Sequence, residues 1–430
     1  MAGLAIGFVV LLAIGMPVAF VLGIGAAIYL ALQPDVGLAV IPQRMFAGLD
    51  QFVLMSIPFF VMSGFLMNEA QLTGRLVQFA DFLLGRRKGG LAQATVLTSM
   101  FFGGITGAAT AEAAAIGSIM IPSMVKAGYR REFATAVTVA ASICGPLIPP
   151  SIPMLIYGVS SGASIGALFL AGVTPGIAVG LSIMLLNRFL LRGGELKARP
   201  PAAASGPGVV RRFFASLRVA LVALGLPVII VAGVVGGIFT PTESSVAAVI
   251  YAFGVGLAMR TLTLRSILRV ICQTALVSAA ILFIVANASL LGWVLTYMQV
   301  PQTIAETFLA YTHSPEVFLF FAVVLLLLAG LFLEPSGAII ILTPVLLPTA
   351  LSFGIDPVHF GVVMVFGMVI GLLTPPVGLC LFVGSSIGEV PFHVLSRAVV
   401  PFVVLLIGVY LFFVYVPVAS IWLPTLLMGR

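Results

Sequence analysis

Apolar runs of helix length, separated by short polar or basic stretches, make up most of the chain. Residues 219–239 and 394–416 are two such runs. A membrane-spanning helix needs about 20 mostly apolar residues, whereas the strands of a membrane barrel alternate over about ten residues. Every backbone polar group inside lipid must also pair within the protein, as it does in a helix. The pattern therefore predicts an all-α polytopic membrane protein.

Twin prolines interrupt two of the apolar runs, and these two runs are copies of each other. Residues 145–150 read Gly-Pro-Leu-Ile-Pro-Pro and residues 371–376 read Gly-Leu-Leu-Thr-Pro-Pro, so the offset is 371 − 145 = 226. The same offset relates further residues: Gly104 and Gly330, Pro122 and Pro348, Gly128 and Gly354, Gly158 and Gly384, Ser160 and Ser386, and Gly162 and Gly388. Proline removes a backbone donor and disfavours helix in the preceding residue. We therefore expect an internal duplication in which each copy has a broken membrane helix, over residues 132–159 and 358–387.

Basic residues on both sides of residues 89–125 indicate a second unusual element. Residues 86–88 (Arg-Arg-Lys) precede this small and apolar stretch, and Lys126 follows it. The positive-inside rule places both ends in the cytoplasm, so the stretch must enter and leave the membrane by one face. This predicts a re-entrant helical hairpin with its tip at Thr106 and Gly107. In the second copy, the hairpin is expected over residues 315–353, with Glu334, Ser336 and Gly337 at its tip.

The topology that follows has nine crossings, two hairpins and a cytoplasmic N-terminus. It places 18 of the 20 Lys and Arg at the cytoplasmic face and only Arg44 and Arg430 outside. This agrees with the positive-inside rule. The expected units, in chain order, are a first repeat over residues 1–192, a basic cytoplasmic linker over 193–218, a connecting span over 219–242 and a second repeat over 243–430. An odd number of crossings separates corresponding elements, so the repeats are inverted.

Composition agrees with this class and excludes several others. The chain is 61% hydrophobic and 8% charged, with a mean hydropathy of +1.26, which fits no soluble domain. The net charge of +7 follows from the topology, so no nucleic-acid partner is expected. No basic residue precedes the first apolar run, which predicts a first span at residues 4–31 rather than a removable signal peptide.

Motifs for enzyme chemistry are absent from the sequence. It has no Gly-x4-Gly-Lys-Ser/Thr loop for a nucleotide. His313, His359 and His393 are too dispersed for a metal or a serine nucleophile and are expected at the membrane interface. Cys144, Cys272 and Cys380 have no CxxC spacing and are expected to be small core residues. We therefore expect no enzyme activity and no cofactor.

Inverted repeats with discontinuous helices are typical of secondary transporters, whose sites lie near the membrane midplane. Half-helix N-termini suit a substrate carboxylate, and unwound carbonyls and hydroxyls suit Na⁺. We expect Na⁺ near Thr106, Gly145, Ser336 and Thr374, with the first tip facing the first break and Ser336 and Gly337 facing the second. The candidate substrate- and ion-binding residues are Thr106, Gly107, Glu112, Gly145, Pro149, Pro150, Glu334, Ser336, Gly337, Gly371, Thr374, Pro375 and Pro376. The alternative is that the breaks are kinks needed only for packing.

Acidic and amide side chains within the apolar runs are the second functional signal. Glu112 and Glu334 either line the ion or substrate path or serve as a helix cap or salt-bridge partner. Glu243 follows Thr240 at a helix start and is expected to cap it. Asn287 either bridges two helices or belongs to the path.

At these residues the sequence resembles the large membrane subunit of the tripartite ATP-independent periplasmic (TRAP) transporters of the dicarboxylate and sialic-acid type. The matching runs are residues 104–107 with 114–117, 145–153 followed by 157–158, 237–243 and 371–378. One departure stands at the first tip. Many members read Ser-Gly-Ser-Ser where this chain has Thr106, Gly107, Ala108 and Ala109, which removes two hydroxyl contacts.

The resemblance implies Na⁺-driven uptake of an organic acid across the bacterial inner membrane. It also implies two partners, a periplasmic solute-binding protein and a small four-helix membrane subunit, which we expect to be a separate chain. The hairpins and broken helices would move as a block in an elevator mechanism. Two alternatives remain: a stand-alone Na⁺- or H⁺-coupled anion symporter of related two-hairpin architecture, and a membrane scaffold or channel without coupled transport.

Overall fold

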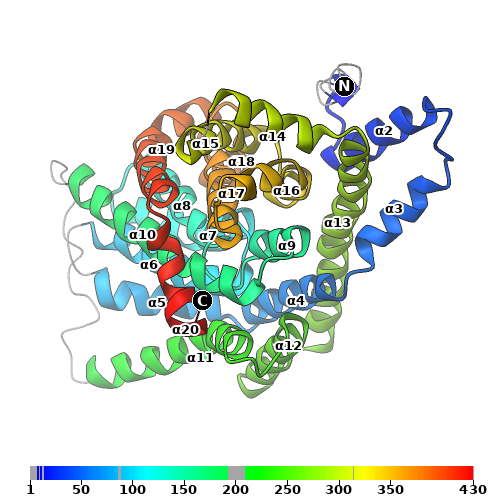
Figure 1. Cartoon of the computed structure of the whole chain (residues 1–430). Coiled ribbons are helices and arrows are strands. Elements are labelled where there is room, and N and C mark those ends of the chain that lie inside the picture. Colours follow the sequence, from blue (N-terminus) through cyan, green and yellow to red (C-terminus); the bar gives the residue numbers. More distant parts are fainter. Residues whose placement is uncertain are drawn as a thin grey trace.

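The computed structural model describes residues 7–8, 10–11, 14–85, 89–191, 209–312 and 314–429; for residues 209–216, 219 and 311 it describes the backbone alone. Within these ranges the regular structure is entirely helical, and no strand occurs. The all-α prediction is confirmed. Figure 1 shows the helices gathered around a group of short, interrupted ones, with α13 standing as a long column at one side.

The column and its neighbours form one side of the molecule. Helix α13 (Leu264–Tyr297) packs against α2 (Val18–Ala31), α3 (Val40–Leu49) and α4 (Ser56–Glu69), and α4 also packs against α12 (Pro241–Ala258). The short η1 (Phe52–Met55) precedes α4. Small residues bring these helices close together: a Cβ on Gly23 would lie 1.9 Å from Asn287 Oδ1, and one on Gly48 would lie 2.2 Å from Ser289 Oγ.

Two expectations for this side are corrected. A first span over residues 4–31 was expected, but Met16 and Pro17 are not helical and α2 begins only at Val18. Helix α3 occupies the segment expected to be a short loop around Arg44. Its sequence carries a proline and a charge, so it does not look like a span, and packing on α13 supplies the stabilisation that an isolated helix of this length lacks.

The first repeat contains a hairpin followed by a broken helix. Helices α6 (Gly90–Thr106) and α7 (Ala109–Lys126) meet at Gly107, whose φ of +61° suits glycine. The broken helix consists of α8 (Arg131–Ala141), η2 (Ser142–Cys144), an irregular stretch and α9 (Ile152–Ser161).

The second repeat contains the same series. Helices α15 (Pro315–Phe332) and α16 (Pro335–Ser352) form its hairpin, and α17 (Pro357–Gly371) and α18 (Leu379–Gly388) form its broken helix. Both twin prolines, Pro149-Pro150 and Pro375-Pro376, have a cis peptide bond.

The two broken helices lie side by side in opposite directions. At one end, the Tyr157 hydroxyl, near the end of α9, donates to the carbonyl of Pro357, at the start of α17, at 2.7 Å. At the other end, Arg131, at the start of α8, bonds Glu389, which follows α18. The loop after α7 leads into α8 and the loop after α16 leads into α17, so the two hairpins open toward opposite ends of the molecule. The breaks and the hairpin tips meet between these ends.

The remaining helices enclose this group. Helix α5 (Leu72–Leu84) packs against α6 and α11 (Val209–Val235), and α14 (Val300–Tyr311) packs against α16. Helix α10 (Ile165–Leu190) packs against α19 (Phe392–Tyr415) and α20 (Pro417–Met428).

Two helix bounds depend on features that the apolar runs alone do not show. Pro417 separates α19 from α20 directly after the apolar run at residues 394–416, because proline lacks the backbone donor that would continue the helix. Helix α11 starts at Val209, before the expected connecting span at 219–242. Residues 193–208, in the expected linker, lie outside the described residues.

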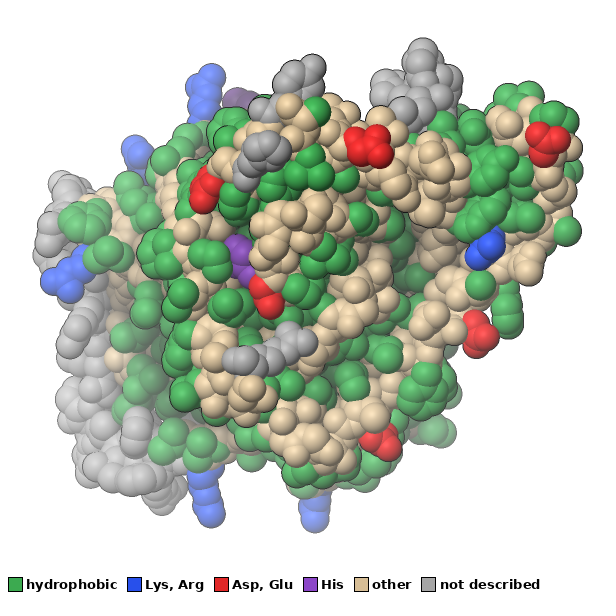
Figure 2. All heavy atoms as spheres, in the orientation of Figure 1, with side chains coloured by type: hydrophobic (Ala, Val, Ile, Leu, Met, Phe, Trp, Pro, Cys, Tyr) green, Lys and Arg blue, Asp and Glu red, His purple; other side chains and the backbone are tan. Residues whose placement is uncertain are grey.

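The surface is that of a membrane protein. In Figure 2, apolar side chains and backbone cover most of the face in view, and the Lys and Arg side chains stand near its margins. Six of the described helices are long and apolar enough to cross a membrane: Phe52–Glu69, Ile165–Leu190, Leu264–Tyr297, Pro315–Phe332, Pro335–Ser352 and Phe392–Tyr415. Shorter apolar helices, including both halves of the second broken helix, add to them. The chain is a multi-pass membrane protein.

Candidate transport site between the hairpin tips

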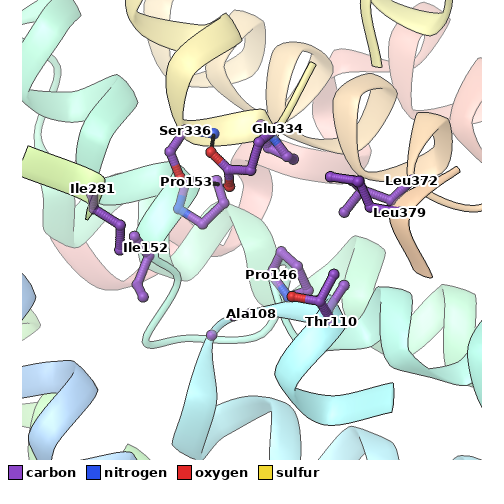
Figure 3. Close-up of a pocket in the computed structure, with 13 residues that line it drawn as sticks. Ala108, Thr110, Pro146, Ile152, Pro153, Ile281, Glu334, Ser336, Leu372 and Leu379 are labelled. Atoms are coloured by element: carbon purple, nitrogen blue, oxygen red, sulfur yellow. Dashed lines mark hydrogen bonds between the residues drawn. The ribbon is translucent and has the colours of Figure 1, made fainter. Parts of the chain in front are cut away.

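A cavity of about 70 Å³ lies where both hairpin tips and both breaks meet. Figure 3 shows Glu334 and Ser336 on one side of it and Ala108, Thr110 and Pro146 on another. The lining residues are Gly107, Ala108, Ala109, Thr110, Pro146, Ile152, Pro153, Ile281, Glu334, Pro335, Ser336, Leu372 and Leu379. Four elements that lie far apart in the sequence thus share one small volume, with one wall from α13.

The first hairpin tip packs directly against the first break, backbone on backbone. A Cβ on Gly107 would lie 2.4 Å from the carbonyl oxygen of Pro150, and one on Gly103 would lie 2.9 Å from Gly145 Cα. No larger residue fits at either place without displacing backbone. Pro149 contributes its carbonyl oxygen behind the tip, 3.2 Å from a Cβ on Gly104.

The N-terminus of α7 points into the cavity without a side-chain cap. Its cap residue, Ala108, has extended backbone angles and no side-chain hydrogen bond, and Ala109 and Thr110 of the first turn line the cavity. The first amides of a helix have no partner inside the helix and carry partial positive charge. An anion in the cavity can therefore accept hydrogen bonds from this end.

The N-terminus of α16 reaches the same cavity but is capped by its own carboxylate. Glu334 accepts hydrogen bonds from the backbone nitrogen of Ser336 at 2.9 Å and of Gly337 at 3.3 Å, and from the Ser336 hydroxyl at 2.9 Å. The carboxylate occupies the place that an external anion would take. The cavity thus presents one free helix N-terminus and one fixed carboxylate.

The second break also contacts the second hairpin through two glycines, as Gly103 and Gly145 do in the first repeat. Helices α15 and α17 touch at Gly330 and Gly371, where a Cβ on Gly371 would lie 2.3 Å from the Gly330 carbonyl carbon. Leu372 and Leu379 reach the cavity, but Thr374, Pro375 and Pro376 are not among its lining residues. The Thr374 hydroxyl donates to the carbonyl of Ile370 at 2.9 Å, and Pro376 is exposed.

The direction of Gly337 differs from the expectation that it faces the second break. A Cβ on Gly337 would lie 2.9 Å from Ile284 of α13. Ser336 and Leu372 still share the cavity.

Glu112 lies behind the cavity rather than in it. Its side chain is fully buried, and neither carboxylate oxygen has a hydrogen-bond partner among the described residues. Glu112 Oε2 lies against Gly145, 2.3 Å from where a Cβ on that glycine would stand. The Ser99 hydroxyl lies beside this carboxylate, outside the geometry of a regular hydrogen bond, and the Thr106 hydroxyl, also on this hairpin, is equally buried without a partner within the described residues. Burying such groups is costly, so this cluster is suited to a small cation.

The other acidic and amide residues have structural contacts. Thr240 and Glu243 form a reciprocal capping box at the start of α12, which confirms the expected cap. Asn287 donates to the Phe283 carbonyl at 2.8 Å and packs on Gly23 of α2, as a residue bridging two helices does.

Two expectations for histidine and cysteine are wrong. His359 is not interfacial: it is buried at the start of α17 and bonds the Ser420 hydroxyl and the Val414 carbonyl. Cys272 is exposed rather than in the core, because α13 turns this face away from its neighbours, whereas Cys144 and Cys380 are buried. His313 lies outside the described residues. Within the described residues, no group of three His, Cys, Asp or Glu side chains could hold a metal ion.

Sequence reasoning missed the apolar lining of the cavity. Pro146 lies within the predicted break and Pro153 three residues after it, so both could have been included with it. Ile152 and Leu379 begin the second half-helices, and Leu379 is the offset equivalent of Pro153 (379 − 226 = 153), so the repeat could have identified it. Ile281 comes from the middle of α13, where the surrounding sequence is uniformly apolar, so no local signal identifies it.

Comparisons with known proteins agree with this arrangement. Residues 5–419 match the family model described as "Tripartite ATP-independent periplasmic transporter, DctM component". The chain is 39% identical over 387 residues to the sialic acid TRAP transporter large permease protein SiaM of Vibrio cholerae, covering 90% of this chain and 89% of that protein. It is 38% identical over 382 residues to the C4-dicarboxylate TRAP transporter large permease protein DctM of Pseudomonas aeruginosa, covering 89% and 88%.

A solved structure has the same fold. The YdaH transporter of Alcanivorax borkumensis superposes with a TM-score of 0.59 at 19% identity, over 91% of this chain and 90% of that one.

Proposed function

We propose that this chain, which belongs to the DctM family of large permeases of tripartite ATP-independent periplasmic transporters, imports an organic acid across the inner membrane, driven by a Na⁺ gradient. Family membership makes it a transporter subunit and not an enzyme. The substrate, the coupling ion, the inner membrane and a cytoplasmic N-terminus are parts of the proposal.

One structural observation supports an organic acid as the substrate. The uncapped N-terminus of α7 faces a cavity whose other helix N-terminus is already occupied by Glu334. A carboxylate from the substrate would accept hydrogen bonds from the α7 amides. Hydroxyl or amide donors on the rest of the substrate would bond the oxygens of Glu334. Among the relatives, one is named for sialic acid and another for C4-dicarboxylates, and either acid carries a carboxylate for α7.

Na⁺ coupling rests on the oxygens that surround the breaks. The hydroxyl of Thr106 is buried without a partner in the described part of the chain, and the Glu112 carboxylate stands against Gly145. Ser336 and Thr374 provide hydroxyls at the second tip and break. A Na⁺ at the first cluster would offset the cost of burying the Glu112 charge. It would also make closure of the first hairpin depend on the ion, because binding stabilises the state that provides the ligands.

The moving part that we propose consists of the hairpins and broken helices, α6–α9 and α15–α18. These elements pack against one another through both breaks, and α13 contributes a wall from outside the group. A small four-helix membrane subunit would brace the stationary side, and a periplasmic solute-binding protein would deliver the acid.

Reconstituted vesicles provide the test. Proteoliposomes with the chain, its small subunit and its binding protein should take up radiolabelled succinate or N-acetylneuraminate when Na⁺ is higher outside, and not when choline replaces Na⁺. Uptake that persists without both Na⁺ and the binding protein would refute the proposal. Na⁺- or H⁺-driven uptake by the purified single chain would instead favour the stand-alone symporter.

A further inference from the structure

A second cavity, of about 150 Å³, lies between the long helix α13 and the group of broken helices. Its walls come from α3 and η1 on one side and from α9 and α16 on the other, with α13 between them. None of its lining residues belongs to the cavity between the hairpin tips. It is therefore a separate space.

The two cavities are stacked along the same three helices. Each of the three helices contributes one residue to each cavity. On α9, α13 and α16 these are Ile152, Ile281 and Ser336 in the first cavity, and Ile156, Val285 and Ile340 in the second. Each step is four residues, so the second cavity lies roughly 6 Å farther along all three helices.

That direction leads away from the loop between α7 and α8. Helix α9 ends beside the start of α17, where α16 also leads, and α14, which follows α13, packs on α16. In the expected topology the Lys and Arg residues gather at the end with the α7–α8 loop, so the positive-inside rule makes the opposite end the outer face of the membrane.

A buried apolar layer separates the cavities. Ile156, Val285 and Ile340 are 1%, 4% and 8% exposed. Beyond this layer the lining becomes polar, with Ser160 on α9, Ser289 on α13 and Gln51 before η1. Within the described residues, none of these three side chains has a hydrogen-bond partner, so their donors and acceptors are free for a ligand.

A basic residue stands one turn farther out. Arg44 lies over the ring of Trp293, 5.0 Å from the guanidinium carbon to the ring centroid, and Trp293 follows Ser289 by four residues on α13. A positive charge at the mouth of a polar cavity raises the local concentration of anions. The order from outside inward is thus a cation, uncharged hydrogen-bonding groups, an apolar layer and the uncapped α7 N-terminus.

We propose that this cavity is an outer binding subsite for the transported organic acid, occupied before the acid reaches the cavity between the hairpin tips. The layer of Ile156, Val285 and Ile340 closes the way between the two. Hydroxyls and an amide bind a hydrated carboxylate or a polyhydroxy chain without holding it tightly, which suits a site that must release its ligand inward. The inference rests on the proposed function for the identity of the ligand.

Thiol accessibility in the full tripartite assembly tests it. Cys272, the exposed native cysteine, is first replaced by Ser. Ser289→Cys is then exposed to methanethiosulfonate ethylsulfonate, an organic anion that does not cross membranes, added from outside. Because the reagent needs a hydrated thiolate, we expect modification about tenfold faster than for Ala280→Cys, on an outward, lipid-facing side of α13. Saturating succinate or N-acetylneuraminate, whichever the assembly transports, should slow modification of the Ser289→Cys variant severalfold and leave that of Ala280→Cys unchanged.

The outcomes separate this inference from the proposed function. If wild-type assembly transports but the Ser289→Cys variant reacts no faster than Ala280→Cys, or reacts equally fast with and without the transported acid, the subsite is refuted and the transport function stands. A second pair of variants gives an independent readout. Ser289→Phe should lower the rate of uptake about tenfold while equilibrium binding of the acid to detergent-solubilised protein is unchanged, whereas Ala280→Phe, on the lipid-facing side of the same helix, should transport normally. Equal uptake by both variants would also refute the subsite.

Discussion

The two hairpin tips occupy the same cavity, yet they present opposite charges to it. At the first tip, α7 begins at Ala108 with free amides, while at the second, α16 begins at Glu334, whose carboxylate covers its own amides. By the repeat offset of 226, Ala108 and Glu334 are equivalent positions. The duplication therefore produced two helix N-termini, and a single side chain decides which of them is open to an anion.

The largest effect is expected from Gly107→Ala at the first tip. The new Cβ would meet the Pro150 carbonyl oxygen at 2.4 Å and push the tip off the break. Because displacement of about 1 Å at a site can cost roughly 100-fold in rate, uptake should fall about that far. The matched control is Gly128→Ala, also at positive φ but with nothing within 4 Å, which should transport normally. Equal loss in both would show that backbone strain, and not the tip contact, is responsible.

Ala108→Asp should give the first tip a capping carboxylate like that of Glu334 at the second tip. The new carboxylate would cap α7 and compete with the substrate for the same amides. Since an anion at a helix N-terminus is worth up to about 2 kcal/mol, the apparent affinity for the acid should weaken roughly 30-fold. Thermal stability should rise, because capping contributes about 1 kcal/mol. Ala108→Asn, a neutral cap, should stabilise similarly with a smaller loss of affinity; identical affinities in the two variants would contradict the charge argument.

Glu112→Gln tests whether the buried carboxylate of the first hairpin binds the coupling ion. Purified wild-type protein should gain thermal stability when Na⁺ replaces choline, because an ion that binds only the folded state stabilises it by up to about 2.7 kcal/mol at 100 times its Kd. The variant should lose most of this gain while retaining its helical circular dichroism. Glu334→Gln serves as the control, since Glu334 already caps α16, and should retain more of the Na⁺ effect. A full Na⁺ response in Glu112→Gln would exclude it as a ligand.

The smallest effects are expected at the two ends of the broken-helix pair. Tyr157→Phe removes the hydrogen bond to Pro357 and should lower stability by about 1 kcal/mol. Glu389→Gln removes the exposed ion pair with Arg131 and should cost roughly 0–1 kcal/mol, less in high salt. Thermal unfolding in detergent at low and high salt compares the two. A larger loss in Glu389→Gln than in Tyr157→Phe would reverse this ranking.

Prolines and basic residues at particular places along the apolar runs made the main elements of the fold predictable. Twin prolines interrupt a helix wherever they stand, and basic residues on both sides of residues 89–125 require a return to the same face, so the broken helices and the first hairpin could be located from sequence. The inverted relation of the repeats followed from counting crossings between copies. These features depend on neighbouring residues and on the membrane, not on which helices pack together.

Packing between distant segments was not predictable in the same way. Glu334 was identified as a tip residue, but whether it faces a ligand or its own amides depends on a rotamer that the sequence does not encode locally. Gly337 packs against Ile284 of α13, and the sequence around Gly337 does not indicate this contact with a distant helix. Ile281 enters the cavity from a helix outside both hairpins, and nothing in its neighbourhood distinguishes it from residues that face lipid.

The opposite openings of the two hairpins give the molecule two ends that can vary independently. Substitutions near the α7–α8 loop act at one end of the molecule, and those near the α16–α17 loop act at the other. A substitution that changes the packing at one opening can therefore leave the other opening as it is.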